Sequence, residues 1–250
     1  MTEGRRTAVV TGASSGIGAA TARALYEAGF DVIGGARRLE QLRSAMDAAG
    51  GRAIELDVAD RASVERFAAQ VERCDVLVNN AGGAHGLEPL AEADDDNWRT
   101  MWESNVFGLM LVTRALLPGL IDSGNGHVVN IGSVAGFEVY PGGAGYTSAK
   151  HGVRAITETL RIELLGKPVR VTEIDPGMVE TEFSVVRFGG DDARAARVYE
   201  GLTPLTADDI ADCVRFAVTR PKHVDIDLMV VRPVAQATVH HVVRGARGEE

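Results

Sequence analysis

The sequence places a phenol and an ammonium four residues apart, at Tyr146 and Lys150. Residues 146–165 carry apolar side chains at helical spacing, and positions i and i+4 of a helix lie on the same face. A tyrosine hydroxyl has a pKa of about 10, which a neighbouring cation lowers. Such a tyrosine can give and take a proton as a general acid/base. Taken alone, a surface pair on an amphipathic helix is the simpler interpretation, so the rest of the chain must decide.

The composition is that of a globular protein without a polyanionic partner. The chain has 250 residues, 45% of them apolar and 24% charged, which suits one large α/β domain or two small ones. Its net charge is -9 and it has no long run of Lys or Arg, so we expect no nucleic-acid partner. Cys74 and Cys213 lack metal or redox spacing, which predicts reduced thiols in the core of a cytoplasmic protein. No His, Cys, Asp or Glu set has metal-ligand spacing, so no metal is expected.

Membrane association is not expected either. The first six residues are polar and lead into a strand, so no signal peptide is visible. The most apolar stretch, residues 108–120, is interrupted by Arg114 and Pro118 and is too short to cross a bilayer. We therefore expect no membrane partner.

Short apolar runs alternate along the chain with stretches of helical periodicity. This alternation, with short links, predicts a parallel sheet with helices on both faces. Residues 182–201 are polar and have glycines in their middle, which indicates a mobile lid over a single domain of residues 1–250. Residues 242–250 are expected to fray. The expected strands are 7–11, 30–35, 52–56, 75–79, 127–131, 169–174 and 226–231, and the main helices are 17–28, 39–49, 61–72, 94–120, 146–165 and 207–218.

A glycine turn separates the first strand from the first helix. Free N–H groups and the helix dipole make such a turn a site for a pyrophosphate, and the first βα junction is where open sheets bind nucleotides. The spacing Gly12-x3-Gly16-x-Gly18 differs from the commoner G-x-G-x-x-G, and a simple tight turn is the alternative. The residues expected to contact a dinucleotide here are Gly12, Ser14, Ser15, Gly16, Ile17 and Gly18.

The end of the second strand predicts which dinucleotide is bound. It carries Ala36 where an acidic residue would hold a ribose 2'-hydroxyl, and Arg37 and Arg38 follow. Guanidinium groups bind a 2'-phosphate by charge-assisted hydrogen bonds, which favours NADP(H) over NAD(H). The alternative is two solvated arginines at a helix start, where cations are mildly unfavourable. Asp57 and Val58, after the third strand, are expected to meet the adenine ring.

Six motifs occur in one order along almost the whole chain. They are Thr11-Gly12-Ala13-Ser14-Ser15-Gly16-Ile17-Gly18, Asn79-Asn80-Ala81-Gly82, Asn105, Ser133, Tyr146-x3-Lys150 and Pro176-Gly177. In this order and spacing the chain resembles the short-chain dehydrogenase/reductase family. The resemblance implies an α/β fold with a single Rossmann-like, doubly wound domain and a seven-stranded parallel sheet. It also implies a homotetramer, with a homodimer as the alternative.

The lid and the tail are similar to one branch of that family. Residues 181–188, 190–192, 204–206, 224–227 and 232–233 resemble the NADP-dependent 3-hydroxy acid (serine 3-) dehydrogenases. The resemblance implies hydride transfer between NADP(H) and a small 3-hydroxy acid or its oxo form. A reductase of a bulkier ketone, such as a 3-oxoacyl thioester, a polyketide or a secondary alcohol, is the alternative. Another alternative is a nucleotide-binding protein that has lost catalysis. Such a protein should lack Ser133, Tyr146 or Lys150, and all three are present.

The same resemblance implies a role for each site residue. Tyr146 is the acid/base, Lys150 lowers its pKa and binds the nicotinamide ribose, and Ser133 binds the substrate oxygen. Asn105 holds a water that links Lys150 to solvent. The implied contacts along the cofactor are Asn79, Ala81, Gly82, Pro176, Gly177, Val179 and Thr181. Considered singly, Ser133 could be a turn residue and Asn105 could bond back to its own helical turn.

A 3-hydroxy acid needs a cationic partner for its carboxylate, beside Ser133 and Tyr146. Arg187 in the lid is the candidate, because its planar fork matches a carboxylate. The alternative is an arginine in solvent. His85 follows the Asn79-Asn80-Ala81-Gly82 motif and is expected either to face the same pocket or to be exposed.

Overall fold

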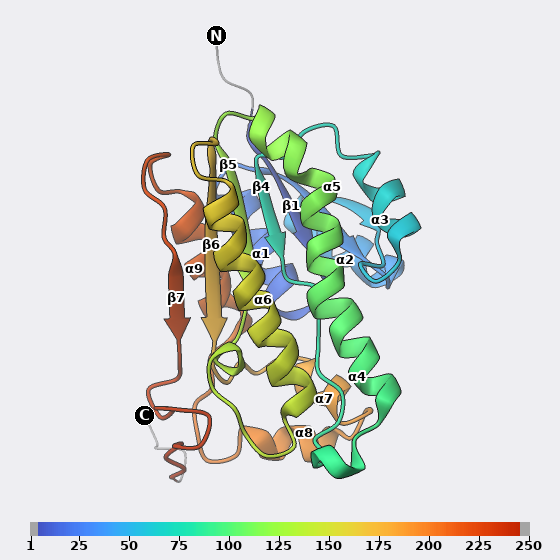
Figure 1. Ribbon diagram of the computed structural model, residues 1–250, viewed down its shortest axis with the longest axis vertical. Coiled ribbons are helices and arrows are strands. Elements are labelled where there is room, and N and C mark those ends of the chain that lie inside the picture. Colours follow the sequence, from blue (N-terminus) through green and yellow to red (C-terminus); the bar gives the residue numbers. More distant parts are fainter. Residues whose placement is uncertain (1–4, 246–250) are drawn as a thin grey trace.

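Seven parallel strands form one sheet in a computed structural model that describes residues 5–245. The strand order is β3-β2-β1-β4-β5-β6-β7, and helices cover both faces (Figure 1). The predicted fold class is confirmed, while the ends of the expected domain, 1–4 and 246–250, lie outside the described residues. The strands are β1 (Thr7–Thr11), β2 (Asp31–Ala36), β3 (Arg52–Glu55), β4 (Val76–Asn79), β5 (Gly126–Ile131), β6 (Val169–Pro176) and β7 (Leu228–Val231).

Side chains of β1 alternate between two hydrophobic cores, one on each face of the sheet. Ala8 and Val10 pack with α1 (Gly16–Glu27), α2 (Leu39–Ala49) and α9 (Ala207–Val218). Val9 points the other way and packs with α3 (Arg61–Ala68), α5 (Gly108–Asp122) and α6 (Ala144–Glu163). Short 3-10 turns η1 (Leu90–Glu92) and η3 (Val134–Gly136) complete the connections. Cys74 and Cys213 are free thiols, the first buried and the second half-buried.

One long helix combines α4 (Asp95–Trp102), a π-helical turn η2 (Glu103–Phe107) and α5. It spans 28 residues with a mean hydropathy of 1.5 in its most apolar window, so by length and composition it is long and apolar enough to cross a membrane. The apolar stretch 108–120, which was expected to be too short for a bilayer, is the second half of this longer helix. In the fold, Val112, Leu116 and Leu120 of this helix are buried against the sheet.

The expected lid folds into two short helices, α7 (Phe183–Arg187) and α8 (Asp192–Val198), at the edge toward which the strand arrows point (Figure 1). This segment is polar in sequence, yet Ala195 of α8 and Tyr199 just after it are buried, and their spacing of four residues puts them on the same face. The Tyr199 hydroxyl lies 2.7 Å from Ser184 Oγ and donates to the Val179 carbonyl at 2.8 Å.

Hydrogen bonds also fix the start of the tail that was expected to fray. The Val243 N–H donates to the Ala235 carbonyl at 2.9 Å, and the Gly245 N–H donates to the Gly201 carbonyl at 3.0 Å. Residues 242–245 are thus tied to the segment beside the lid, and the rest of the predicted tail, 246–250, lies outside the described residues.

A buried threonine joins the carboxyl ends of β1 and β4. Thr11 Oγ1 accepts the N–H groups of Asn80 and Ala81, both at 3.0 Å. The Asn80 side-chain amide donates in return to the carbonyls of Thr11 at 3.0 Å and Gly12 at 3.3 Å. These bonds fix the glycine turn against the loop that follows β4.

Thr11→Val keeps the shape of this side chain but leaves two backbone N–H groups without their acceptor. We expect the free energy of unfolding to fall by about 1–3 kcal/mol, measured by urea denaturation. Thr7→Val is the matched control on the same strand, because no hydrogen bond of the Thr7 hydroxyl occurs in the described residues. Equal stability of the two variants would contradict the role given to Thr11.

Candidate active site

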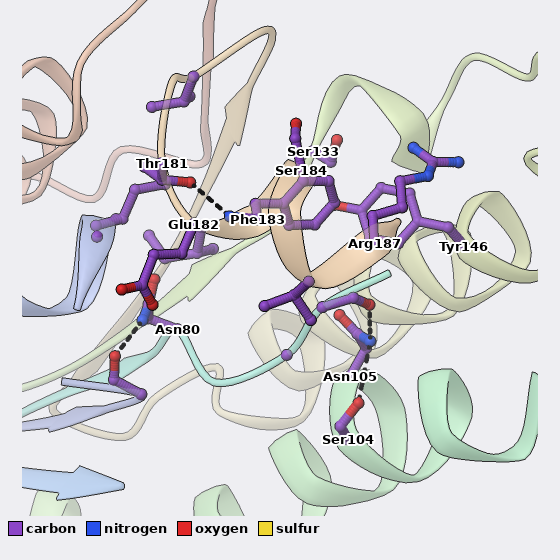
Figure 2. Close-up of a pocket in the computed structure, with 18 of the residues that line it drawn as sticks. Asn80, Ser104, Asn105, Ser133, Tyr146, Thr181, Glu182, Phe183, Ser184 and Arg187 are labelled. Atoms are coloured by element: carbon purple, nitrogen blue, oxygen red, sulfur yellow. Dashed lines mark hydrogen bonds between the residues drawn. The ribbon is translucent and has the colours of Figure 1, made fainter. Parts of the chain in front are cut away.

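A cavity of about 860 Å³ opens where the carboxyl ends of the strands meet the lid (Figure 2). Its walls come from every loop at this edge of the sheet, so residues distant in sequence share one space. Gly18 and Asn79 are the two predicted site residues that do not line it. The predicted residues that line it are Gly12, Ser14, Ser15, Gly16, Ile17, Arg37, Arg38, Asp57, Val58, Ala81, Gly82, His85, Asn105, Ser133, Tyr146, Lys150, Pro176, Gly177, Val179, Thr181 and Arg187.

The glycine turn brings backbone N–H groups to one end of the cavity. Gly12 and Gly16 have φ angles of 66° and 52°, which favour glycine. Ser15 is the N-cap of α1 and makes no side-chain cap bond, so the first N–H groups of the helix remain for a ligand. Gly18 acts through packing instead, because a Cβ there would run into the Gly12 carbonyl.

Arg38 lies beside this turn and connects it to the lid. Its Nη2 donates to Ser15 Oγ at 3.0 Å and Ser14 Oγ at 3.4 Å, and it forms an ion pair with Glu182 at 3.0 Å. The hydrogen bonds from Arg38 and Ser15 lower the pKa of Glu182. A guanidinium beside two hydroxyls fits a phosphate, and Glu182 shows that the position accepts an anion. Sequence reasoning missed Glu182, because its partner lies 144 residues away.

The two asparagines after β4 have different environments. The Asn79 side chain, expected along the cofactor, is buried and donates to Thr113 Oγ1 at 2.8 Å and Asn130 Oδ1 at 2.9 Å. Asn80 instead borders the cavity. Successive residues of a strand point to opposite faces, so this alternation could have separated the two.

The chain brings Ser133, Tyr146 and Lys150 together beyond the end of β5. Lys150 Nζ donates to the Ile131 carbonyl at 2.8 Å and lies 5.9 Å from the centroid of the Tyr146 ring. Ser133 Oγ accepts the Ala135 N–H at 3.1 Å, as a turn residue would, and also hydrogen-bonds Tyr146. The i, i+4 spacing thus places the phenol and the ammonium on one face of α6, as the sequence predicted.

Burial controls the protonation of both groups. It raises the pKa of Tyr146, and Tyr140 adds to this, while Ser133 and Arg187 lower it. The lowering of this pKa by Lys150 stays a prediction, because its ammonium donates to the Ile131 carbonyl of β5. Burial lowers the pKa of Lys150 to about 8. At neutral pH the phenol is therefore protonated and the ammonium remains charged.

Asn105 lies in the π-helical turn, a distortion often found at functional sites. Its Nδ2 bonds back to the Met101 carbonyl at 2.8 Å and also donates to the Gly83 carbonyl at 2.9 Å. Its Oδ1 is buried and has no hydrogen-bond partner among the described residues. A buried acceptor of this kind fits a bound water, so the predicted back-bond and the predicted water site are compatible.

Arg187 extends from α7 toward Tyr146 (Figure 2). Its guanidinium lies 5.4 Å from the Tyr140 ring centroid and 5.9 Å from that of Tyr146. Arg187 and Gly86 exchange two hydrogen bonds, one through Arg187 Nε and one through its carbonyl, both 3.0 Å long. These bonds join α7 to the loop that follows β4. His85 also faces the cavity, and burial followed by the charge of Arg37 lowers its pKa.

The fold and this site define a dinucleotide-dependent oxidoreductase of the Rossmann type. The turn, the arginine at the end of β2 and the Ser133–Tyr146–Lys150 group occupy one cavity. The family model for short chain dehydrogenases matches residues 6–188. The chain belongs to the short-chain dehydrogenase family.

Individual relatives are similar over nearly their whole length. An uncharacterized oxidoreductase of Mycobacterium tuberculosis is 58% identical, over 94% of this chain and 93% of the relative. The NADP-dependent 3-hydroxy acid dehydrogenase YdfG of Salmonella typhimurium is 45% identical, over 92% and 95%. Among solved structures, the closed form of serine dehydrogenase complexed with NADP+ is 40% identical with a TM-score of 0.91, over 95% of this chain and 99% of that one.

Arg38→Ala removes the guanidinium from the predicted 2'-phosphate position. We expect the Kd of NADPH, measured by fluorescence titration, to rise about tenfold to a hundredfold, because hydrogen bonds to charged groups contribute about 1.5–3 kcal/mol. The Kd of NADH should change little. Arg43→Ala, an exposed arginine of α2, is the control. Equal weakening of both cofactors would contradict the assignment.

Proposed function

We propose that this protein is an NADP-dependent oxidoreductase that interconverts a small 3-hydroxy acid and its oxo form. The observation that carries the proposal is one cavity with Arg38 at its phosphate end and Arg187 beside Tyr146 at its catalytic end. The similarity to proteins named NADP-dependent 3-hydroxy acid dehydrogenase and serine dehydrogenase supports it. When bound, NADP(H) supplies or accepts the hydride.

The chain's own groups handle the proton and the oxygen. In the reductive direction, the neutral Tyr146 phenol donates a proton to the substrate oxygen. Ser133 donates a hydrogen bond to the same oxygen as its charge develops. Lys150 holds the nicotinamide ribose and stabilises the phenolate that is left. Asn105 Oδ1 accepts from a water through which Lys150 exchanges protons with solvent.

The remaining predicted contacts follow the cavity from end to end. Gly12, Ser14, Ser15, Gly16 and Ile17 hold the pyrophosphate side, and Arg37 and Arg38 the 2'-phosphate. Asp57 and Val58 meet the adenine, and Ala81 and Gly82 line the path beyond it. Pro176, Gly177, Val179 and Thr181 surround the nicotinamide carboxamide. Their common exposure to the cavity supports these assignments.

Arg187 binds the substrate carboxylate in this proposal. Within the described residues only its Nε donates a hydrogen bond, which leaves the two terminal nitrogens for a carboxylate. The contact with Gly86 means that the same residue closes the lid. A bulkier, uncharged ketone would give this cation no counter-charge, so the geometry favours a small acid over that alternative.

We further propose that the lid, residues 182–201, opens to admit its ligands and that the protein works in the cytoplasm as a homotetramer, or alternatively a homodimer. Exposed apolar side chains near the helices that carry Asn105 and Tyr146 support an assembly: Phe107, Ile162 and Leu165 are 54%, 76% and 88% exposed. Large exposed apolar side chains of this kind are found at protein contacts. Light scattering of the purified protein measures the assembly directly.

Tyr146→Phe removes only the hydroxyl that exchanges the proton. We expect kcat to fall at least about a thousandfold, because general acid catalysis contributes about 10²–10⁴. The Kd of NADPH should stay within about threefold, since the ring and its neighbours remain. Tyr26→Phe changes a tyrosine outside the cavity and serves as the control. Retained turnover would contradict the role of Tyr146.

Arg187→Ala removes the proposed carboxylate partner. We expect kcat/KM for 3-hydroxypropionate to fall about tenfold to a hundredfold or more, while kcat/KM for an uncharged secondary alcohol changes little. Arg194→Ala is the control, because this lid arginine packs on Phe188 and does not line the cavity. A parallel loss for acid and alcohol would assign Arg187 to lid closure alone and contradict carboxylate binding.

A further inference from the structure

Two carboxyl side chains lie buried behind the catalytic group. Glu173 and Asp175 are 2% and 0% exposed, and neither lines the cavity. They are two residues apart on β6 and therefore share one face of the strand. Glu173 lies opposite Asn130 of β5, whose side chain donates to Thr157 Oγ1 of α6 at 2.9 Å, so this face is the one beneath the helix of Tyr146 and Lys150.

Asp175 fixes the backbone from which Ser133 extends. Its Oδ1 accepts the Ser133 N–H at 2.9 Å. The carboxylate approaches the chain so closely that a Cβ on Gly132 would run into both Asp175 Oδ1 and Glu173 Oε1. The direction in which the chain leaves β5 thus depends on the Asp175 side chain.

Each carboxyl group can be the hydrogen-bond partner that the other lacks. Asp175 Oδ2 and Glu173 Oε1 are buried and have no donor among the described residues. Two adjacent carboxylates would repel each other, whereas one shared proton turns the two acceptors into a hydrogen-bonded pair. Burial and then the charge of Asp175 raise the pKa of Glu173 to about 8, and burial also raises the pKa of Asp175. Because Asp175 Oδ1 accepts the Ser133 N–H, which favours its ionised form, Glu173 holds the shared proton at neutral pH and the pair carries one negative charge.

That charge acts on Lys150. Burial destabilises the ammonium, while Asp175 and then Glu173 raise the Lys150 pKa again. The other ionisable groups that face this cluster are Arg154 and Tyr146 on α6, Arg187 on α7, and Tyr140 on the loop before α6. Two of these are cations, so the carboxyl pair is the source of negative charge.

We propose that Asp175 and Glu173 are positioning residues that share one proton, hold the Ser133 backbone in place and keep the Lys150 ammonium charged. The inference rests on the proposed function, because Ser133 and Lys150 have these roles only in the proposed hydride transfer. Neither carboxyl group touches the cavity, so both act through those two residues.

The test compares two variants that keep the side-chain shapes. Glu173→Gln removes the shared proton but leaves Asp175 ionised, whereas Glu173→Gln with Asp175→Asn removes the charge as well. In the reductive direction, the alkaline limb of kcat/KM against pH should stay in place for the single variant. In the double variant it should move about one unit or more to lower pH, because the loss of an opposite charge lowers the pKa of Lys150. Asp225→Asn, at a carboxyl outside this site, should leave the limb unchanged.

Infrared difference spectroscopy gives a readout that needs no turnover. At neutral pH the wild-type protein should show the carbonyl stretch of a protonated carboxyl group, and Glu173→Gln should remove it. Asp225→Asn should retain it. This measurement also covers the case in which the double variant does not fold, as judged by circular dichroism.

Three results would overturn the inference: no protonated-carboxyl band in the wild type, a band that survives Glu173→Gln, or a folded double variant with the wild-type alkaline limb. If the wild-type protein had no activity on 3-oxo acids, the proposed function would be contradicted instead. The infrared result would still stand in that case, so the two failures are distinguishable.

Discussion

Parallel pairing brings the carboxyl ends of β1, β4, β5 and β6 to one edge of the sheet, and the site depends on that constraint. Each strand must be followed by a crossover, and each crossover begins with a few residues at the same edge. The glycine turn, the loop after β4, Ser133 and the lid all start there. Thr11 then joins two of these ends by hydrogen bonds, which fix the glycine turn against the loop after β4.

Charge compensation is the second organising feature of the site. The exposed guanidinium of Arg38 has Glu182 and two serine hydroxyls, while the buried ammonium of Lys150 has a backbone carbonyl and the carboxyl pair. A buried charge without such a partner would cost several kcal/mol. The arrangement fits proton transfer, because the phenol of Tyr146 is neutral where the neighbouring ammonium is kept charged.

The sequence predicted the strands, the helices and the shared face of Tyr146 and Lys150, because each depends on local periodicity. It did not predict long-range effects. The ion pair of Glu182 joins distant segments, and the raised pKa of Tyr146 depends on burial that only the fold creates. The Asp95–Asp122 helix agrees with the predicted range 94–120, but the π-helical turn at Asn105 within it was not predicted. For Asn79, the alternation of strand residues distinguishes its buried side chain from that of Asn80, which borders the cavity.

The most direct measurement is the initial rate of the wild-type protein with NADP and with NAD across matched substrates. The panel pairs 3-hydroxypropionate and L-serine with their uncharged methyl esters and adds simple secondary alcohols. The account predicts turnover of the acids with NADP, at a kcat/KM about tenfold or more above that of the esters, since a charged hydrogen bond contributes about 1.5–3 kcal/mol. Turnover of uncharged alcohols alone, or a preference for NAD, would contradict it.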